Sequence, residues 1–346
     1  MRKLNSIRIL RAVAATTVIV HHVMITNGTA FGAFRVDIFF VLSGFVIALA
    51  LGAGTITVRD FVVSRVARIV PLYWLMTLVV FTGAVLKPDL FNSTTANVGE
   101  LLKSLLFIPY QKESGQMYPM LFVGWTLNYE MLFYAVSALA LLLLRERRFA
   151  FITLLLGALF FCASAARPTH AVWLFLAQDR LLEFPLGIAA WMVWKRGTRV
   201  PVPLAAVGVV AMYVFMTCAE WALPGSPPLV RNGLPSFCLV LCALSLEGVI
   251  ADNRCTRALA YIGDASYATY LSHPFVVEGM RKLLPRFVHG FDVRTLSGAM
   301  LAIVCATCVG CLFYRFVDRP LFKAARRTLE ARVPGGLAAD SNNAVR

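Results

Sequence analysis

Two basic side chains interrupt an apolar segment near the N-terminus, Arg11 and His22. They are eleven residues apart, which in an α-helix is about three turns plus 20°, so both side chains lie on one helix face. Their separation along the axis is roughly 16 Å. Imidazole suits general-base or nucleophilic chemistry because it titrates near neutral pH. We therefore expect Arg11 and His22 to line one path. The simpler interpretations are a snorkelling arginine and a packing histidine.

A second basic pair, Arg65 and Arg68, is one helical turn apart before an apolar segment. The planar guanidinium group donates paired hydrogen bonds that match phosphate oxygens, so this pair is suited to gripping a phosphate-bearing ligand. The alternative is a cluster that only anchors the chain at the cytoplasmic membrane surface. Further along, Glu130 and Tyr134 are at positions i and i+4 of an apolar segment, where the phenol, or a basic group of another helix, is expected to hold the carboxylate.

Three further polar features have both a structural and a functional interpretation. Asp37 begins an apolar segment and is either an acid at a helix N-terminus or part of a site. Tyr267, Tyr270 and His273 form a polar stripe that would bind a hydroxyl-rich ligand or bond to other helices. Three cysteines, at positions 305, 308 and 311, share a helix face, but no histidine or acid adjoins them. We therefore expect no metal site.

These side chains must be positioned by membrane helices, because 59% of the 346 residues are hydrophobic and only 15% are charged. Apolar segments of about twenty residues recur along the whole chain. The sequence predicts an all-α integral membrane protein of about ten transmembrane helices in one bundle, without a soluble domain. We expect this domain to span residues 1–333 and residues 334–346 to be a disordered cytoplasmic tail. The predicted crossings are 7–28, 36–54, 69–86, 122–144, 149–166, 178–194, 202–222, 234–250, 258–279 and 296–317.

Charge indicates the orientation. Most of the 33 lysines and arginines fall on one side if both termini are cytoplasmic, as the positive-inside rule requires. The exception is a basic loop, 281–294, assigned to the outside; it either binds an anionic substrate or shows that the count is off by one crossing. The net charge of +15 comes from short clusters between apolar segments, which does not indicate nucleic-acid binding. The long loop 87–121 is expected to form a lid or an interfacial helix.

Taken together, the polar segments resemble the acyltransferase-3 family of membrane-bound O-acyltransferases. In chain order the matching segments are Leu10–Ala14 with His22, Val36–Phe45, Arg65–Trp74, Trp125–Tyr134, Gly263–His273 and Tyr314–Leu321. In the last segment the family commonly has glutamate where this chain has Asp318, so no role is assigned to that residue.

The resemblance implies an enzyme that moves an acyl group, commonly acetyl, from cytoplasmic acyl-CoA to a hydroxyl of an exported glycan or lipid-linked sugar. It further implies a bacterial inner membrane location with membrane lipids as surroundings, and acyl-CoA as donor substrate rather than a bound cofactor. On this basis His22 and Glu130 are the expected catalytic residues. Arg11, Arg65 and Arg68 are expected to hold the CoA phosphates. The expected acceptor-binding residues are Asp37, Ser43, Trp125, Tyr267, Tyr270 and His273.

Two other classes of function fit some of these observations. A secondary transporter or flippase also needs charged residues along an intramembrane path, although we find no inverted repeat in the sequence. A regulatory or assembly subunit would not need the arginine pair. Consumption of acyl-CoA without an ion gradient would separate the enzyme from the transporter.

Overall fold

The computed structural model describes residues 4–25, 35–90, 94–112, 115–166, 169–289 and 291–331, and within these ranges the chain is helical without any strand. Seven of the described helices are long and apolar enough to cross a membrane, and Val36–Gly52 is a shorter apolar helix. The protein is therefore an all-α, multi-pass membrane protein, as expected. The count of ten crossings stays a prediction, and the expected tail 334–346 lies outside the described residues.

The longer helices have the following bounds: α1 Asn5–Ile25, α2 Arg35–Gly52, α3 Val58–Leu86, α4 Val98–Leu105, α5 Trp125–Leu143, α6 Arg148–Ala165, α7 Ala171–Leu176, α8 Glu183–Lys195, α9 Val202–Ala222, α10 Leu234–Ser245, α11 Arg254–Asp264, α12 Ser266–Lys282, α13 Leu296–Phe313 and α14 Arg319–Ala331. Short 3₁₀ turns occur at Pro88–Leu90, Phe122–Gly124, Asp179–Leu182, Glu247–Val249 and Leu284–Arg286. Two π-helical segments, η4 Leu229–Gly233 and η7 Tyr314–Asp318, precede α10 and α14.

The third helix differs from its predicted range. It begins at Val58 instead of residue 69, because the Thr57 side chain caps it by accepting a hydrogen bond from the Asp60 backbone N–H. The segment with Arg65 and Arg68, expected as part of a loop, is thus the beginning of a 29-residue helix. An apolar-window criterion detects only the hydrophobic part of such a helix.

Two other predicted crossings are also divided. Residues 258–279 fall in α11 and α12, which are separate helices that meet at Ala265. The predicted crossing 178–194 falls in a 3₁₀ turn and α8, and the separate short helix α7 precedes them. The loop 87–121 contains α4, and the Trp74 indole of α3 donates to the carbonyl of Leu105, the last residue of α4, at 2.8 Å.

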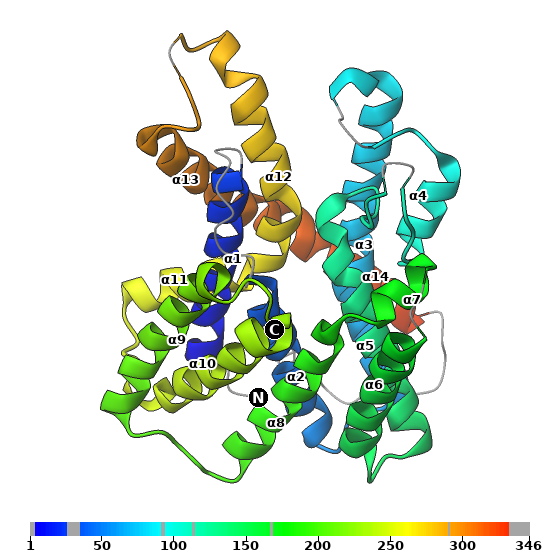
Figure 1. Cartoon of the computed structure of the whole chain (residues 1–346), viewed down its shortest axis with the longest axis vertical. Helices are drawn as coiled ribbons and strands as arrows, with labels where there is room; N and C mark the ends of the chain where they lie inside the picture. Colours follow the sequence, from blue (N-terminus) through cyan, green and yellow to red (C-terminus); the bar gives the residue numbers. More distant parts are fainter. Residues whose placement is uncertain are drawn as a thin grey trace.

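The helices form two groups with α2 and α8 between them (Figure 1). Helices α3 to α7 lie on one side, and α1 with α9 to α13 on the other. Helix α14 returns to the beginning of α3, where Arg59 donates to the Glu330 carbonyl at 2.7 Å. A cavity between such groups would be lined by residues far apart in the sequence.

Helix α1 is fixed by charged contacts at its beginning. The Glu247 carboxylate accepts the backbone N–H groups of Asn5 and Ser6 at 3.0 and 2.7 Å, which suits the positive end of a helix dipole. One turn later, Arg8 forms a two-pronged ion pair with Asp264 at 3.0 and 2.7 Å. These contacts set the position of α1 along α11, and hence how far Arg11 and His22 lie from the beginning of α11.

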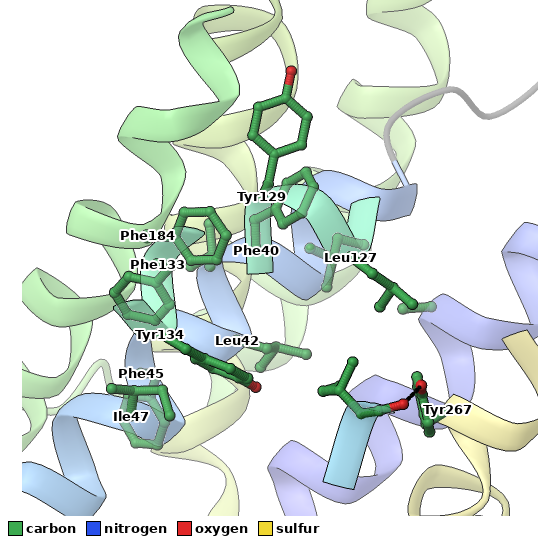
Figure 2. Close-up of a cluster of buried hydrophobic side chains, with 14 of the residues drawn as sticks. Phe40, Leu42, Phe45, Ile47, Leu127, Tyr129, Phe133, Tyr134, Phe184 and Tyr267 are labelled. Atoms are coloured by element: carbon green, nitrogen blue, oxygen red, sulfur yellow. Dashed lines mark hydrogen bonds between the residues drawn. The ribbon is translucent and has the colours of Figure 1, made fainter. Parts of the chain in front are cut away.

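Helices α2 and α8 cross at two glycines. A Cβ atom on Gly44 would lie 2.2 Å from the Phe184 carbonyl oxygen, and one on Gly187 would lie 2.1 Å from the Val41 carbonyl oxygen. Such close approach of small residues is how membrane helices maximise packing. Beside the crossing, Phe133 of α5 stacks on Phe184 at 4.4 Å and Phe40 lies 5.2 Å from Phe184, forming the aromatic cluster of Figure 2. This cluster holds α5 against α2 and α8.

Candidate active site

A cavity of about 150 Å³ opens between five helices, α1, α2, α3, α5 and α12. Its wall combines apolar side chains with a polar group from each of these helices. The polar lining residues are Arg11, Ser43, Arg65, Arg68, Thr126, Glu130, Tyr134, Ser266, Tyr267 and Tyr270. All three arginines predicted to hold CoA phosphates therefore line one cavity, although they belong to two helices.

Arg68 is held by an acid that the sequence left without a role. Its guanidinium donates to the Asp318 carboxylate at 2.7 Å and lies over the Tyr267 ring at 5.1 Å. Asp318 is only 2% exposed and ends the π-helical segment η7. The Tyr267 hydroxyl donates in turn to the Ile69 carbonyl of α3 at 2.6 Å, the dashed line in Figure 2. Arg68 is thus oriented from two sides.

The other two arginines have neutral partners. Arg11 donates to the Ser266 hydroxyl of α12 at 3.0 and 3.2 Å. Arg65 lies between the rings of Phe61 and Tyr134, at 6.0 and 5.9 Å. Within the described ranges, neither Arg11 nor Arg65 has a carboxylate at ion-pair distance. The cavity therefore carries an excess of positive charge that favours an anionic ligand.

Glu130 faces the same cavity from α5. Its carboxylate accepts hydrogen bonds from the Ser43 hydroxyl of α2, at 2.7 Å, and from the Tyr134 hydroxyl one turn along α5. The predicted phenol partner is thus confirmed. Ser43, predicted only as acceptor-binding, is a ligand of this carboxylate. These contacts group Glu130 with the arginines of the cavity rather than with His22.

His22 is paired with a second histidine. Its Nδ1 lies 3.1 Å from Nε2 of His273 on α12, and the ring centroids are 4.7 Å apart. Arg11 and His22 both contact α12, which confirms that they share one face of α1. His273 is fully buried, whereas His22 is half-buried and lies 5.4 Å from the Phe122 ring.

The carbonyl contacts of the two rings favour one arrangement of their protons. His273 Nδ1 lies 2.8 Å from the Tyr270 carbonyl oxygen, so Nδ1 is the N–H donor and Nε2 carries the lone pair. His22 Nδ1 lies 2.9 Å from the Val18 carbonyl oxygen and 3.1 Å from the nitrogen with that lone pair, so an Nδ1–H suits both contacts. The neutral His22 ring then carries its lone pair on Nε2, the atom a base or nucleophile would use.

The histidine pair lies one turn beyond the cavity along α12. Tyr270 lines the cavity, and its hydroxyl bonds to the Val123 carbonyl at 2.8 Å and to the Thr126 hydroxyl at 2.9 Å. Among the described residues that line the cavity, neither His22 nor His273 occurs. A ligand that reaches from the arginines to His22 must therefore pass Tyr270.

Comparison with known proteins decides the family. A family model described as an acyltransferase domain, Acyl_transf_3, matches residues 4–315. The chain belongs to the acyltransferase-3 family. No solved structure matches it.

Three proteins of known sequence are similar to this chain over most of its length. The exopolysaccharide production protein ExoZ of Rhizobium meliloti is 35% identical over 89% of this chain and 94% of its own length. BcsY of Komagataeibacter xylinus, provisionally named a membrane-bound transacylase, is 27% identical over 90% of this chain and 81% of its own. YrhL of Bacillus subtilis, provisionally named a peptidoglycan O-acetyltransferase, is 25% identical over 94% of this chain and 56% of its own.

Three predicted acceptor-binding residues of this acyltransferase lie outside the cavity. His273 belongs to the histidine pair, and Asp37 and Trp125 lie with a second buried polar group. Asp37, in the first turn of α2, pairs with Arg180 at 3.7 Å, and Arg180 lies over the Trp125 ring at 5.2 Å. Glu183 and Asn232 complete the group, and both are fully buried. Sequence reasoning missed Arg180 and Glu183, although the signal that identified Glu130, an ionisable residue in an apolar segment, applies to them equally.

The three cysteines that share a helix face, at positions 305, 308 and 311, are not part of a metal-binding group within the described residues. In the described part of the chain, no group of three or more histidine, cysteine, aspartate or glutamate side chains is placed to hold a metal ion. The same part contains eight cysteines, and each is a free thiol.

Proposed function

We propose that this protein transfers an acyl group, acetyl in the simplest case, from acyl-CoA to a hydroxyl of an exported glycan or lipid-linked sugar. The observation that carries the proposal is the set of three arginines in one membrane-embedded cavity, one turn from a histidine pair. Burying a guanidinium in a membrane is costly unless it serves a ligand or a partner, and two of the three arginines have no acidic partner within the described residues.

The chemistry of the cavity supports acyl-CoA as the donor. CoA combines several phosphate oxygens with a long, flexible pantetheine arm that ends in the thioester. Arg11, Arg65 and Arg68 supply forked donors for the phosphates. Along α1, Arg11 and His22 are roughly 16 Å apart, a span that an extended pantetheine arm crosses. The thioester would then reach His22 once the Tyr270 side chain moves to another rotamer.

The reaction needs a group that removes a proton from the acceptor hydroxyl or that carries the acyl group itself. His22 Nε2 fits either role, because a proton on Nδ1 leaves the lone pair of the neutral ring on Nε2. Glu130, which is held by Ser43 and Tyr134, balances the arginines and positions the donor within the cavity.

The acceptor class rests on the relatives. One is named for exopolysaccharide production, and another provisionally for peptidoglycan O-acetylation. We assign the arginine cavity to the cytoplasmic side and the histidine pair to the opposite side of a bacterial inner membrane, with both termini in the cytoplasm. The excess of lysine and arginine on that side supports this orientation.

The test uses the full chain purified into lipid nanodiscs, with radiolabelled acetyl-CoA and a soluble β-glucan oligosaccharide as acceptor. We expect CoA thiol release and labelled oligosaccharide without any ion gradient, and both lost in His22→Ala. A protein that consumes no acetyl-CoA in nanodiscs but moves labelled sugar across vesicles under an ion gradient is a transporter, and the proposal fails.

A further inference from the structure

His273 is anchored in an unusual way within its own helix. In an α-helix the N–H of residue 274 would bond to the carbonyl of residue 270, but Pro274 has no N–H. The Tyr270 carbonyl instead accepts the Nδ1–H of His273 at 2.8 Å, while the Thr269 carbonyl lies at 3.2 Å from the same nitrogen. The His273-Pro274 pair thus fixes both the tautomer and the orientation of the His273 ring.

With its Nδ1–H held by α12, His273 presents its Nε2 lone pair to His22. The 3.1 Å distance between His273 Nε2 and His22 Nδ1 is that of a hydrogen bond. His273 is fully buried, so the bond is not exchanged for one with water. This arrangement corresponds to a base whose ring is oriented by a second group, which is the general pattern of catalytic triads.

We propose that His273 is the positioning residue of this acyl transfer and that it accepts a proton through His22. The inference rests on the proposed function. As the acceptor oxygen attacks the thioester carbonyl, its proton moves to His22 Nε2, and the Nδ1 proton of His22 moves to His273 Nε2. The new C–O bond forms and the C–S bond breaks. The thiolate sulfur then receives a proton back from His22, His273 returns its own, and both rings end neutral.

A histidine suits this position better than the carboxylate found in many triads. A permanent negative charge at a fully buried membrane site is costly, whereas a neutral imidazole is much less so. Once protonated, the His273 ring is stabilised by the two carbonyl dipoles that face its Nδ1–H. The pair therefore holds positive charge only while the reaction proceeds.

The experiment compares steady-state kinetics of four variants in nanodiscs. His273→Leu removes both acceptor and anchor; His273→Gln keeps an oxygen near the Nε2 position but cannot take up a proton. Pro274→Ala restores the N–H that competes for the Tyr270 carbonyl. His170→Gln, at an exposed histidine whose side chain caps no helix, is the matched control.

We expect kcat to fall by about 10²- to 10⁴-fold in His273→Leu, less in His273→Gln, and by about tenfold in Pro274→Ala, with the KM for acetyl-CoA kept within about twofold. His170→Gln should match the parent. A kcat of His273→Leu within about threefold of the parent overturns the inference. So does a loss of activity that is explained by a higher KM for acetyl-CoA, or by failure of the variant to purify as a folded protein. If His22→Ala is inactive while the His273 variants overturn the inference, the proposed acyl transfer still stands, because it does not depend on His273.

Discussion

Arg68 of α3 and Asp318 of η7 form an ion pair at 2.7 Å across 250 residues of sequence. The pair joins the arginines proposed to bind CoA to η7, the segment that directly precedes α14. Because Asp318 ends a π-helical turn, its side chain is aimed at Arg68 by an irregular piece of backbone, a feature often found at functional sites.

The first prediction concerns this pair. Asp318→Asn should raise the KM for acetyl-CoA by about ten- to a hundredfold, because a hydrogen bond to a charged group contributes about 1.5–3 kcal/mol. Asp318→Glu, which has the residue common in the family, should keep the KM near the parent value. An Asp318→Asn enzyme with an unchanged KM would show that Arg68 needs no orientation.

The second prediction concerns Arg65, which lacks an acidic partner among the described residues. Arg65→Ala should raise the KM for acetyl-CoA by at least about tenfold, and Arg65→Lys should restore only part of the loss because an ammonium cannot form the paired bonds of guanidinium. Arg147→Ala, at an exposed arginine, is the control for a general loss of positive charge. Equal KM values for Arg65→Ala and Arg147→Ala would contradict the assignment.

The third prediction tests the α2–α8 crossing. Gly187→Ala places a methyl group 2.1 Å from the Val41 carbonyl oxygen, so the helices must separate. Overpacking of this kind costs about 1–3 kcal/mol. The thermal stability of the purified protein should therefore fall. Gly157→Ala, where the added methyl group has no neighbour within 4 Å, should leave it unchanged. Equal melting of the two variants would disprove the close crossing.

The fourth prediction concerns the buried group of Asp37, Arg180 and Glu183. Arg180→Met removes a cation that faces two buried carboxyl groups, and leaving a buried charge unpaired costs about 3–5 kcal/mol. Thermal unfolding should show this loss. The double variant Arg180→Met with Asp37→Leu should recover part of it, since one carboxyl is then removed. Additive destabilisation by the two changes would argue against direct pairing.

The sequence by itself determined the class of the molecule and most of the residues that matter. Its composition required membrane helices, because the backbone can satisfy its own hydrogen bonds in lipid only in such regular structures. Helical spacing alone placed Arg11 with His22 on one face and Glu130 beside Tyr134, since these relationships are local. The order of short motifs along the chain indicated the acyltransferase-3 family.

Only the tertiary structure decided which helices meet. The pairing of His22 with His273 joins α1 to α12, and no sequence spacing specifies which distant helix a face will contact. Asp37 and Trp125, predicted to bind the acceptor, both contact Arg180, near the close crossing of α2 and α8 at Gly44 and Gly187. Helix packing in a membrane depends on the shapes of whole surfaces, so these contacts could be found only once the surfaces were assembled.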